Sequence, residues 1–292
     1  MRGHFAFVAG ITTGAMLAAW VPAPVQRTDG SARTASSPAA ALSPSQSFVS
    51  RAGRATARDT APAFTVDGLV ALHSFMSLSD AHLQNLAGVL TVLASTDAAR
   101  SGDWQRIGSP LGEAARLTIP AVHWFALPDG RYWTVEQGRV AASLADRPYF
   151  RRVLAGQTVI GDLVVSRSSS RNTAIVAVPV RGRGGSVVGV LGASVYLDSL
   201  AARVRQEMGG LGSGVVFYAI DGNGLGALNS DPTLIFTEPL KLGDAEMRSA
   251  FTEMLAGREG TVRYTFRGSR RLVMYATSNV TNWRYGFGVT VP

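Results

Sequence analysis

A short segment that begins at Arg147 carries the side chains best suited to hold a charged ligand. Arg147 is followed closely by Tyr149 and Phe150. A guanidinium group presents a planar fork of N–H donors, so Arg147 can bind a carboxylate through two parallel hydrogen bonds. Two other interpretations stay open. Arg147 could cap a helix or pair with Asp146 or Asp162, and the two aromatic rings could be ordinary core residues.

A predicted hairpin contributes the next candidates. Two strand-like runs flank residues 128–130, whose Pro-Asp-Gly sequence is a strong turn signal. Side chains alternate between the two faces along a strand. Therefore only one of Trp124 and Phe125, and only one of Tyr132 and Trp133, can face a ligand pocket. The sequence does not say which, and we take Trp124 and Trp133 as the candidates.

The residues needed for catalysis are sparse. The chain has no cysteine and four histidines, which are His4, His73, His82 and His123. Disulfides and thiolate chemistry are therefore excluded. His123 lies in a strand and could reach a pocket, but no serine or cysteine arrangement accompanies it. The glycine-rich turn at 222–226 lacks the lysine and the following helix of a phosphate loop. We predict that the protein is not an enzyme and that it has no cofactor and no metal site.

Composition and charge narrow the class of protein. Hydrophobic residues make up 46% of the 292 residues and charged residues 16%, which is enough apolar material for a sizeable core. The net charge is +8, and Lys241 is the only lysine. The arginines are scattered apart from short pairs such as 151–152, and no basic run is interleaved with aromatic residues. We therefore predict no nucleic-acid binding.

The first 26 residues have the layout of an export signal. Arg2 precedes an uncharged apolar stretch, residues 5–21, and small residues follow it. The stretch is close to the lower limit of about 17 residues for crossing a bilayer. We expect residues 1–26 to be either a signal peptide or an N-terminal membrane anchor. The expected location is periplasmic or extracellular, and an uncleaved segment would anchor the protein to the inner membrane. Residues 27–63, rich in Ser, Ala, Arg and Pro, are predicted to be a disordered linker.

The elements that must position the candidate residues follow an α+β order. Between residues 65 and 96, apolar side chains recur at alternating spacings of three and four, as on one face of a long amphipathic helix. We predict this long N-terminal helix and a connecting helix within residues 64–118. Two modules follow, 119–208 and 209–292, each an antiparallel sheet flanked by helices. The apolar stripe of the long helix also permits a homodimer.

Internal repetition supports the two modules. Leu-Ala-Gly ends the predicted helix of the first module at residues 154–156 and that of the second at 255–257. The last strand of each module contains a similar motif, Gly192-Ala193-Ser194-Val195 in the first and Gly288-Val289-Thr290-Val291 in the second, so we predict that Gly192 corresponds to Gly288.

A series of motifs stands in a fixed order along the chain. It comprises Asp146-Arg147-Pro148-Tyr149-Phe150, Val164-Val165-Ser166-Arg167, Ala177-Val178-Pro179-Val180, Val188-Gly189-Val190-Leu191-Gly192-Ala193, and Gly260 to Tyr264 through Trp283-Arg284-Tyr285-Gly286. The series resembles the double Cache (PDC-like) family of extracytoplasmic sensors, over about residues 65–292. The resemblance implies signal transduction of the chemoreceptor kind, with a small ligand in the membrane-distal module, 119–208, and a membrane-proximal module, 209–292.

One branch of this family binds amino acids, and the sequence departs from its motif. Arg147 matches the arginine of the branch, and Tyr149 and Phe150 occupy its aromatic pair. Ser194 stands where the branch has an aspartate for the ammonium of the ligand, and a serine hydroxyl cannot neutralise that charge. We therefore expect a carboxylate-type ligand without an amine. Its expected contacts are Arg147, Tyr149, Phe150, Trp124, Trp133 and Ser194.

The expected partner is a membrane signalling protein. The sequence stops at Pro292, and no second apolar segment and no kinase or methyl-accepting region follows the modules. A membrane partner could read the domain, or the chain could be a stand-alone binding protein or a truncated receptor. The alternative function is a non-catalytic interaction protein that docks a membrane partner and has a vestigial pocket.

Overall fold

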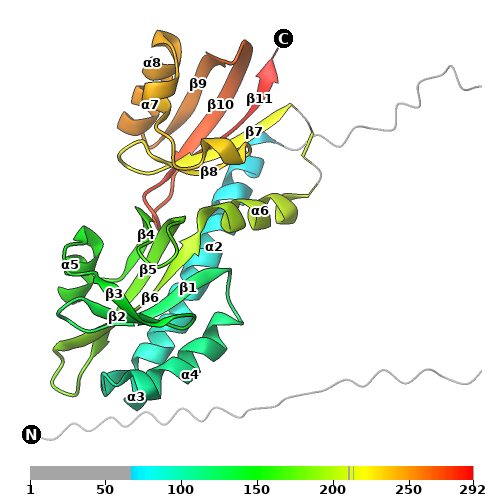
Figure 1. Cartoon of the computed structure of the whole chain (residues 1–292). Coiled ribbons are helices and arrows are strands. Elements are labelled where there is room, and N and C mark those ends of the chain that lie inside the picture. The colour runs from blue at the N-terminus through cyan, green and yellow to red at the C-terminus, as the bar shows by residue number, and fades with distance from the viewer. Residues whose placement is uncertain (1–66, 210, 213, 292) are drawn as a thin grey trace, which may run out of the picture. The chain divides into compact units, whose positions relative to one another are not determined.

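A computed structural model of the protein describes residues 67–209, 211–212 and 214–291. The predicted export signal, 1–26, and the predicted linker, 27–63, lie outside the described residues. The first described elements are α2 (Gly68–Ala94), α3 (Asp97–Arg100), α4 (Trp104–Ala115), β1 (Ala121–Ala126), β2 (Arg131–Thr134), β3 (Gly138–Ser143), α5 (Pro148–Leu154), β4 (Val159–Val165), β5 (Asn172–Arg181), β6 (Val187–Tyr196) and α6 (Leu197–Met208). They are followed by β7 (Val215–Ile220), β8 (Gly226–Asn229), η1 (Pro232–Leu234), α7 (Pro239–Leu242), α8 (Ala245–Ala256), β9 (Glu259–Phe266), β10 (Ser269–Thr277) and β11 (Arg284–Val291). The predicted α+β class, a long helix followed by antiparallel sheets flanked by helices, is confirmed (Figure 1).

The long helix α2 packs against both sheets (Figure 1). Asp67 caps it, because its carboxylate accepts a hydrogen bond from the backbone N–H of Leu69 at 2.7 Å. The predicted apolar stripe belongs to one core shared with both sheets. Its fully buried members are Leu72, Leu83, Leu86 and Leu90. Because both sheets pack on this buried stripe, α2 holds the two sheets together.

The first sheet has the strand order β3-β2-β1-β6-β5-β4, with every pair antiparallel. Helix α5 covers one face, and α2 and α4 cover the other. The continuous apolar run of β6 lies at the centre, as expected for a strand buried on both faces. The sequence pattern does not predict the edge strands. In β3 only Val140 is buried, and Gly161 and Asp162 interrupt the apolar residues of β4.

The second sheet has the order β8-β7-β11-β10-β9 and is also antiparallel. Helix α8 covers one face, and α2 packs on the other. On the α2 face, the ring of Phe75 lies between Phe217 and Tyr285, at centroid distances of 5.0 and 5.1 Å. The two sheets are therefore built alike, each with its own helix on one face and α2 on the other.

The strand register corrects one detail of the predicted repeat. Trp124 of β1 pairs with Gly192, and Tyr218 of β7 pairs with Gly286. Each ring lies over its glycine, because a Cβ on Gly192 would be 2.2 Å from the indole and one on Gly286 2.7 Å from the phenol ring. Gly286, not Gly288, is thus the equivalent of Gly192. A shift of two residues keeps every side chain on its face, so sequence similarity could not distinguish the two alignments.

The connection between β10 and β11 joins the second sheet to the first. The indole N–H of Trp283 donates a hydrogen bond to the carbonyl oxygen of Gly161 in β4, at 2.9 Å. Gly161 has a φ of +94°, and a Cβ there would lie 2.9 Å from the Cβ of Thr281. Only glycine fits this position, because it adopts a positive φ readily and leaves room for the side chain of Thr281.

The same connection is tied to α2 by a buried carboxylate. Asp80 accepts hydrogen bonds from the hydroxyls of Ser278, at 2.8 Å, and Tyr285, at 3.3 Å. Burial is the largest influence on Asp80 and raises its pKa above the ordinary value, although the hydrogen bonds oppose the shift. A polar link of this kind fixes the position of the connection along α2.

Candidate ligand-binding site

A small polar pocket lies on the α5 face of the first sheet. Its cavity volume is about 10 Å³, roughly the space that one water molecule needs. The described residues that line it include no carboxylate. Its polar lining consists of Tyr132, Arg147, Tyr149, Ser166, Arg167, Ser168 and Ser194. Arg167 is paired with Asp146 outside the lining, so Arg147 supplies the unbalanced positive charge of the pocket, which favours an anionic ligand.

Arg147 reaches the pocket from the start of α5. Pro148 is the first helical residue and holds Arg147 in an extended backbone conformation, with φ −73° and ψ 126°. One guanidinium nitrogen, Nη2, donates to the carbonyl oxygen of Val165 at 2.8 Å. Among the described residues, no carboxylate forms an ion pair with Arg147. The rest of its donor fork is therefore not committed to the protein.

The carboxylates that the sequence offers to Arg147 are bound by other arginines. Asp162 pairs with Arg152. Asp146 accepts two hydrogen bonds from Arg167, at 2.7 Å from Nη1 to Oδ1 and 2.6 Å from Nη2 to Oδ2. These bonds lower the pKa of the Asp146 carboxyl to about 2. The side chain of Arg147 makes no capping hydrogen bond on α5 either. Arg147 therefore occupies the N-cap position of α5, but its side chain forms neither a capping hydrogen bond nor an ion pair with Asp146 or Asp162.

Arg167, which lines the pocket, is held by an ion pair with Asp146. Arg167 also donates to the carbonyl oxygen of Ser143, so it connects residues 143–146 with the loop after β4. Within that loop, the hydroxyls of Ser166 and Ser168 lie 3.2 Å apart. The motif that contains Ser166 and Arg167 is visible in the sequence, but its position over the pocket comes from the pairing of β4 with β5.

Three aromatic side chains, Trp124, Tyr132 and Tyr149, line the pocket. Trp124 is 2% exposed and its indole N–H donates to the Ser194 hydroxyl at 3.2 Å. Its ring centroid is 6.4 Å from that of Tyr149. The oxygen of Ser194 is thus already engaged by the indole. Phe150 is fully buried in the core between α5 and the sheet, and it is not a lining residue.

Tyr132 faces the pocket, and Trp133 does not. Trp133 pairs with Phe125 on the opposite face, where its ring stacks on Trp104 of α4 at 6.5 Å. The structure therefore does not bring Trp133 together with the other candidates. The Tyr132 hydroxyl is buried and has no hydrogen-bond partner among the described residues. Such an orphaned donor needs a ligand or a water molecule to satisfy it.

The hairpin turn decides which aromatic residue faces the pocket. Gly130 has a φ of +87°, and the N–H of Leu127 donates to the carbonyl oxygen of Arg131 at 2.9 Å. Residues 128–130 therefore form the loop. With this loop, Trp124 lies opposite Thr134, so alternation puts Tyr132 on the face of Trp124. A loop shorter by one residue would have placed Trp133 on the face of Trp124 instead.

His123 lies on the opposite face and away from the pocket. Its Nε2 is 3.1 Å from the Thr118 hydroxyl, and its Nδ1 is 3.3 Å from the carbonyl oxygen of Ala121. Burial lowers its pKa. His82 instead pairs with Glu207, at 2.8 Å. No group of three or more His, Cys, Asp or Glu side chains suited to a metal ion occurs in the described part of the chain.

A sequence comparison identifies the family. The sequence model for the Cache domain, of the double type, matches residues 71–291. The chain belongs to the Cache-domain family. The match spans the described elements from α2 to β11, which agrees with the resemblance noted in the ordered motifs. A search of curated proteins found no match.

Solved Cache structures share this fold. The ligand-binding domain of the Pseudomonas aeruginosa amino-acid chemoreceptor PctB, in complex with L-Arg, is 16% identical with a TM-score of 0.62. The ligand-binding domain of the Pseudomonas fluorescens chemoreceptor CtaA, in complex with L-alanine, is 15% identical with a TM-score of 0.58. Each comparison covers 76% of this chain and 93% of the other.

The family also bears on the cellular compartment. Cache domains are extracytoplasmic. In the described residues, no helix is both long and apolar enough to cross a membrane. The predicted N-terminal anchor lies outside these residues and stays a prediction.

A larger groove in this Cache domain has a different chemistry. It has a volume of about 640 Å³ and lies between the start of α2, the end of α6 and strands β10 and β11. Its lining is mostly apolar. Its one charged lining residue among those described, Glu207, is bound to His82 and Arg203. The groove therefore lacks the uncommitted charge that the pocket around Arg147 offers.

Replacing Gly192 with alanine is expected to lower the free energy of unfolding by about 1–3 kcal/mol, the usual cost of overpacking. The new Cβ would overlap the Trp124 indole, which forms the pocket wall. Chemical denaturation measures the loss. Gly184→Ala is the matched control, because nothing lies within 4 Å of a Cβ at that position. Combining Gly192→Ala with Trp124→Phe should restore part of the loss, and no restoration would contradict the proposed clash.

Proposed function

We propose that this protein is an extracytoplasmic small-ligand sensor whose pocket, in the module 119–208, binds a carboxylate-type ligand through Arg147. The observation that carries the proposal is a guanidinium group that faces a polar pocket and has no carboxylate partner among the described residues. Arg147 and the ligand carboxylate would form charge-assisted, bidentate hydrogen bonds. Tyr132 supplies a further hydroxyl that has no partner of its own.

The ligand in this proposal carries no amine. The lining residues include no carboxylate that could balance an ammonium group, and burying such a charge unpaired is costly. Ser194, which stands where the amino-acid branch has an aspartate, is hydrogen-bonded to Trp124. PctB and CtaA were solved with amino acids. The lining chemistry supports a simple organic acid here instead.

Binding requires the pocket to open, because a volume of about 10 Å³ holds little more than one water molecule. In our proposal the Asp146–Arg167 pair is the part that moves. Both residues belong to surface loops, so water can replace their hydrogen bonds when the pair separates. Separating them would free Arg167 to become a second donor to the acid.

The sensor would act through a membrane signalling partner. Helix α2 shares its core with both sheets, so it is suited to pass a change in the first module to the rest of the domain. The polar chemistry around Arg147 supports this function over an interaction protein with a vestigial pocket. The apolar stripe that suggested a homodimer is buried in the core of the domain itself, so a dimer through α2 would need another face of this helix. The module boundaries 64–118, 119–208 and 209–292 belong to the same proposal.

A thermal-shift screen of the purified protein tests the proposal. The screen should include organic acids, amino acids, polyamines, purines and sugars. A ligand at about 100 times its Kd stabilises the folded state by about 2.7 kcal/mol. For a protein of this size the midpoint should rise by roughly 5–10 °C. We expect the rise with one class of organic acid, and we expect Arg147→Ala to abolish it.

Arg151→Ala is the matched control. Arg151 lies on the same helix, is exposed, and makes no side-chain contact with the pocket. Arg147→Lys keeps the charge but loses the fork, so it should retain only part of the rise. A rise with amino acids alone would contradict the amine-free ligand. A rise that survives Arg147→Ala would place the ligand elsewhere, and no rise with any compound would favour the interaction protein.

A further inference from the structure

A second small cavity lies in the other module, on the α8 face of the second sheet. Its volume is about 30 Å³, larger than the 10 Å³ of the pocket around Arg147. Two water molecules, or one carboxylate group, need about this much space. The walls come from β7, β9, β10 and α8, and the segment from β8 to α7 closes the cavity.

Arg271 is the charged group in this cavity. It pairs directly with Tyr264 of the neighbouring strand, so both side chains lie on the α8 face. Its guanidinium carbon is 4.7 Å from the centre of the Phe266 ring. Its Nε is buried and has no hydrogen-bond partner among the described residues. A buried N–H of a charged group that lacks a partner is costly, so a ligand or water is needed to satisfy it.

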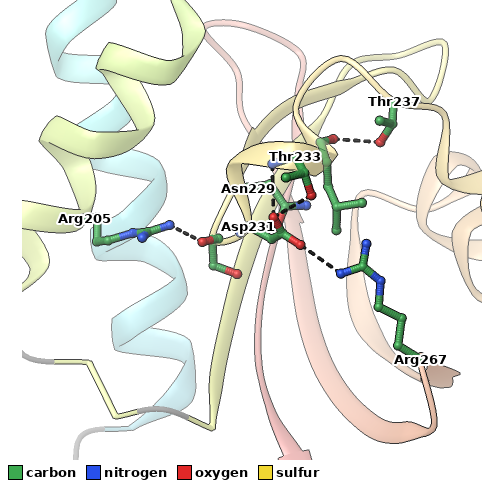
Figure 2. A network of polar contacts seen from close by, with 8 residues as sticks. Arg205, Asn229, Asp231, Thr233, Thr237 and Arg267 are labelled. Carbon is green, nitrogen blue, oxygen red and sulfur yellow. Dashed lines mark hydrogen bonds and ion pairs between the residues drawn. The ribbon is translucent and has the colours of Figure 1, made fainter.

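The acidic groups around the cavity are committed to other partners. Asp231 pairs with Arg267 at 3.1 Å and accepts hydrogen bonds from the backbone and hydroxyl of Thr233 (Figure 2). Glu246 accepts a hydrogen bond from the backbone N–H of Thr265 at 3.0 Å. The described lining contains no carboxylate. The charge of Arg271 is thus not balanced from within the cavity.

The neighbouring polar groups are neutral. The Tyr264 hydroxyl donates to the Tyr218 hydroxyl at 3.3 Å, and this in turn donates to the sulfur of Met254 at 3.4 Å. Burial raises the pKa of both tyrosines, although Arg271 opposes the shift at each. Asn229 also lines the cavity. Its side-chain oxygen accepts from the N–H of Asp231 at 2.9 Å, which leaves its amide N–H groups as donors.

The segment that closes the cavity is fastened on both sides (Figure 2). Arg205 of α6 donates a hydrogen bond to the carbonyl oxygen of Ser230. On the other side, Asp231 binds Arg267 at the turn between β9 and β10. Further along, the N–H of Gly226 donates to the carbonyl oxygen of Thr237 at 2.7 Å. The cavity is therefore preformed, which lowers the entropy that binding would cost.

We propose that this cavity binds a short carboxylate of the size of formate or acetate, through the guanidinium of Arg271 with the amide of Asn229 as a second donor. Arg271 supplies the charge and the orphaned Nε, and Met247 and Phe251 of α8 supply an apolar wall for a methyl group. The volume of about 30 Å³ favours a short acid over branched or longer ones. This site is independent of the one proposed at Arg147, since the two lie on different sheets.

Acetate titrations of the full chain with 13C-methyl methionine test the proposal. Met247 lines the cavity, whereas Met76 of α2 does not, so the two methyl signals separate local binding from a general salt effect. Sodium pivalate is the control probe, because it carries the same carboxylate on a group too bulky for the cavity. We expect acetate to shift the Met247 signal saturably and to leave Met76 unchanged.

Matched variants assign the site. In Arg271→Met, acetate should bind at least about tenfold more weakly, in line with the loss of a charge-assisted hydrogen bond. Arg270→Ala removes an exposed arginine from the opposite face of β10 and should leave binding unchanged. Arg147→Ala should also leave it unchanged. Should Arg271→Met fail to fold, Arg271→Lys is the second variant, and it should weaken binding while preserving the charge.

Three results with the wild-type protein and the Arg271 variants would each overturn the proposal. These are the absence of a saturable Met247 shift in the wild-type protein, an unchanged affinity when Arg271 is replaced, and an equal response to pivalate. A Met247 shift that disappears in Arg147→Ala would also overturn it, because acetate would then act through the other module. The first three results leave the carboxylate screen at Arg147 untouched, whereas the fourth would support binding of acetate at Arg147.

Discussion

Trp283→Ala should lower the free energy of unfolding by about 3–5 kcal/mol, the usual loss for a large aromatic residue removed from a core. Trp283 is 1% exposed, and its ring centroid lies 6.1 Å from that of Tyr285. The substitution would leave a cavity where the second sheet meets β4. It would also leave the carbonyl oxygen of Gly161 without the indole N–H that it accepts from.

Chemical denaturation measures this effect, and Trp283→Phe is the matched control. The phenylalanine ring keeps most of the buried area but cannot donate to Gly161. Trp283→Phe should therefore lose less unfolding free energy than Trp283→Ala. Its loss reports mainly the missing hydrogen bond, about 0.5–1.5 kcal/mol, and the further loss in Trp283→Ala reports the packing. If Trp283→Ala cost less than about 1 kcal/mol, the contact between Trp283 and β4 would be less tightly packed than the structure indicates.

The same variant should weaken ligand binding at the pocket around Arg147. Strand β4 carries both Gly161, which Trp283 holds, and Val165, whose carbonyl oxygen anchors Arg147. Loosening one end of this strand is expected to disturb the other. The carboxylate that raises the wild-type midpoint should therefore bind Trp283→Ala more weakly than Trp283→Phe. Equal affinities of Trp283→Ala and Trp283→Phe would show that the contact of Trp283 with β4 does not affect the pocket.

The second large effect concerns Asp80 and pH. Its pKa in the folded protein is raised by burial, whereas the unfolded chain keeps the ordinary value near 3.8. The folded state therefore binds the Asp80 proton more tightly than the unfolded state does. The stabilisation from this group is complete below pH 3.8 and is lost as the pH rises through the raised pKa.

Asp80→Asn isolates this contribution, since asparagine does not titrate. The free energy of unfolding of the wild-type protein, relative to Asp80→Asn, should increase as the pH falls from neutral toward about 4. Other carboxylates act in the opposite direction. Asp146, for example, has a lowered pKa. The difference between the two proteins removes their effect, and a difference that does not change with pH would contradict the raised pKa of Asp80.

Asp80→Ala should be far more damaging than Asp80→Asn. Alanine leaves the buried hydroxyls of Ser278 and Tyr285 without their acceptor, and each lost bond to a charged group is worth about 1.5–3 kcal/mol. Asparagine keeps an oxygen at the same place and preserves one of the bonds. Denaturation curves of the two variants at one pH compare them directly.

Several features could be predicted from the sequence because they depend on local order. The alternating spacing of Leu72, Leu83 and their neighbours defines α2, since the helical period puts them on one face. The continuous apolar run of β6 predicts a strand buried on both faces. The ordered motifs from Asp146 to Gly286 predicted the Cache family, which the sequence model confirms. The guanidinium chemistry of Arg147 also follows from residue type alone.

The choice between Tyr132 and Trp133 needed the tertiary structure. Alternation along a strand fixes which residues share a face, but the loop at 128–130 sets the register between two strands. A change of one residue in that loop would exchange the two rings. The internal repeat could not be aligned from sequence for the same reason. Only the pairing of β11 with β7 shows that Gly286 corresponds to Gly192.

The partners of the charged groups were likewise decided by the fold. By sequence, Asp146 and Asp162 were equally available to Arg147, yet strand pairing brings Arg167 to Asp146 and Arg152 to Asp162. The cavity at Arg271 left no sequence signal, because its walls come from separate strands and one helix. Sequence determined the elements and the chemical groups, whereas long-range pairing determined which groups face one another, since a local pattern does not encode distances across a sheet.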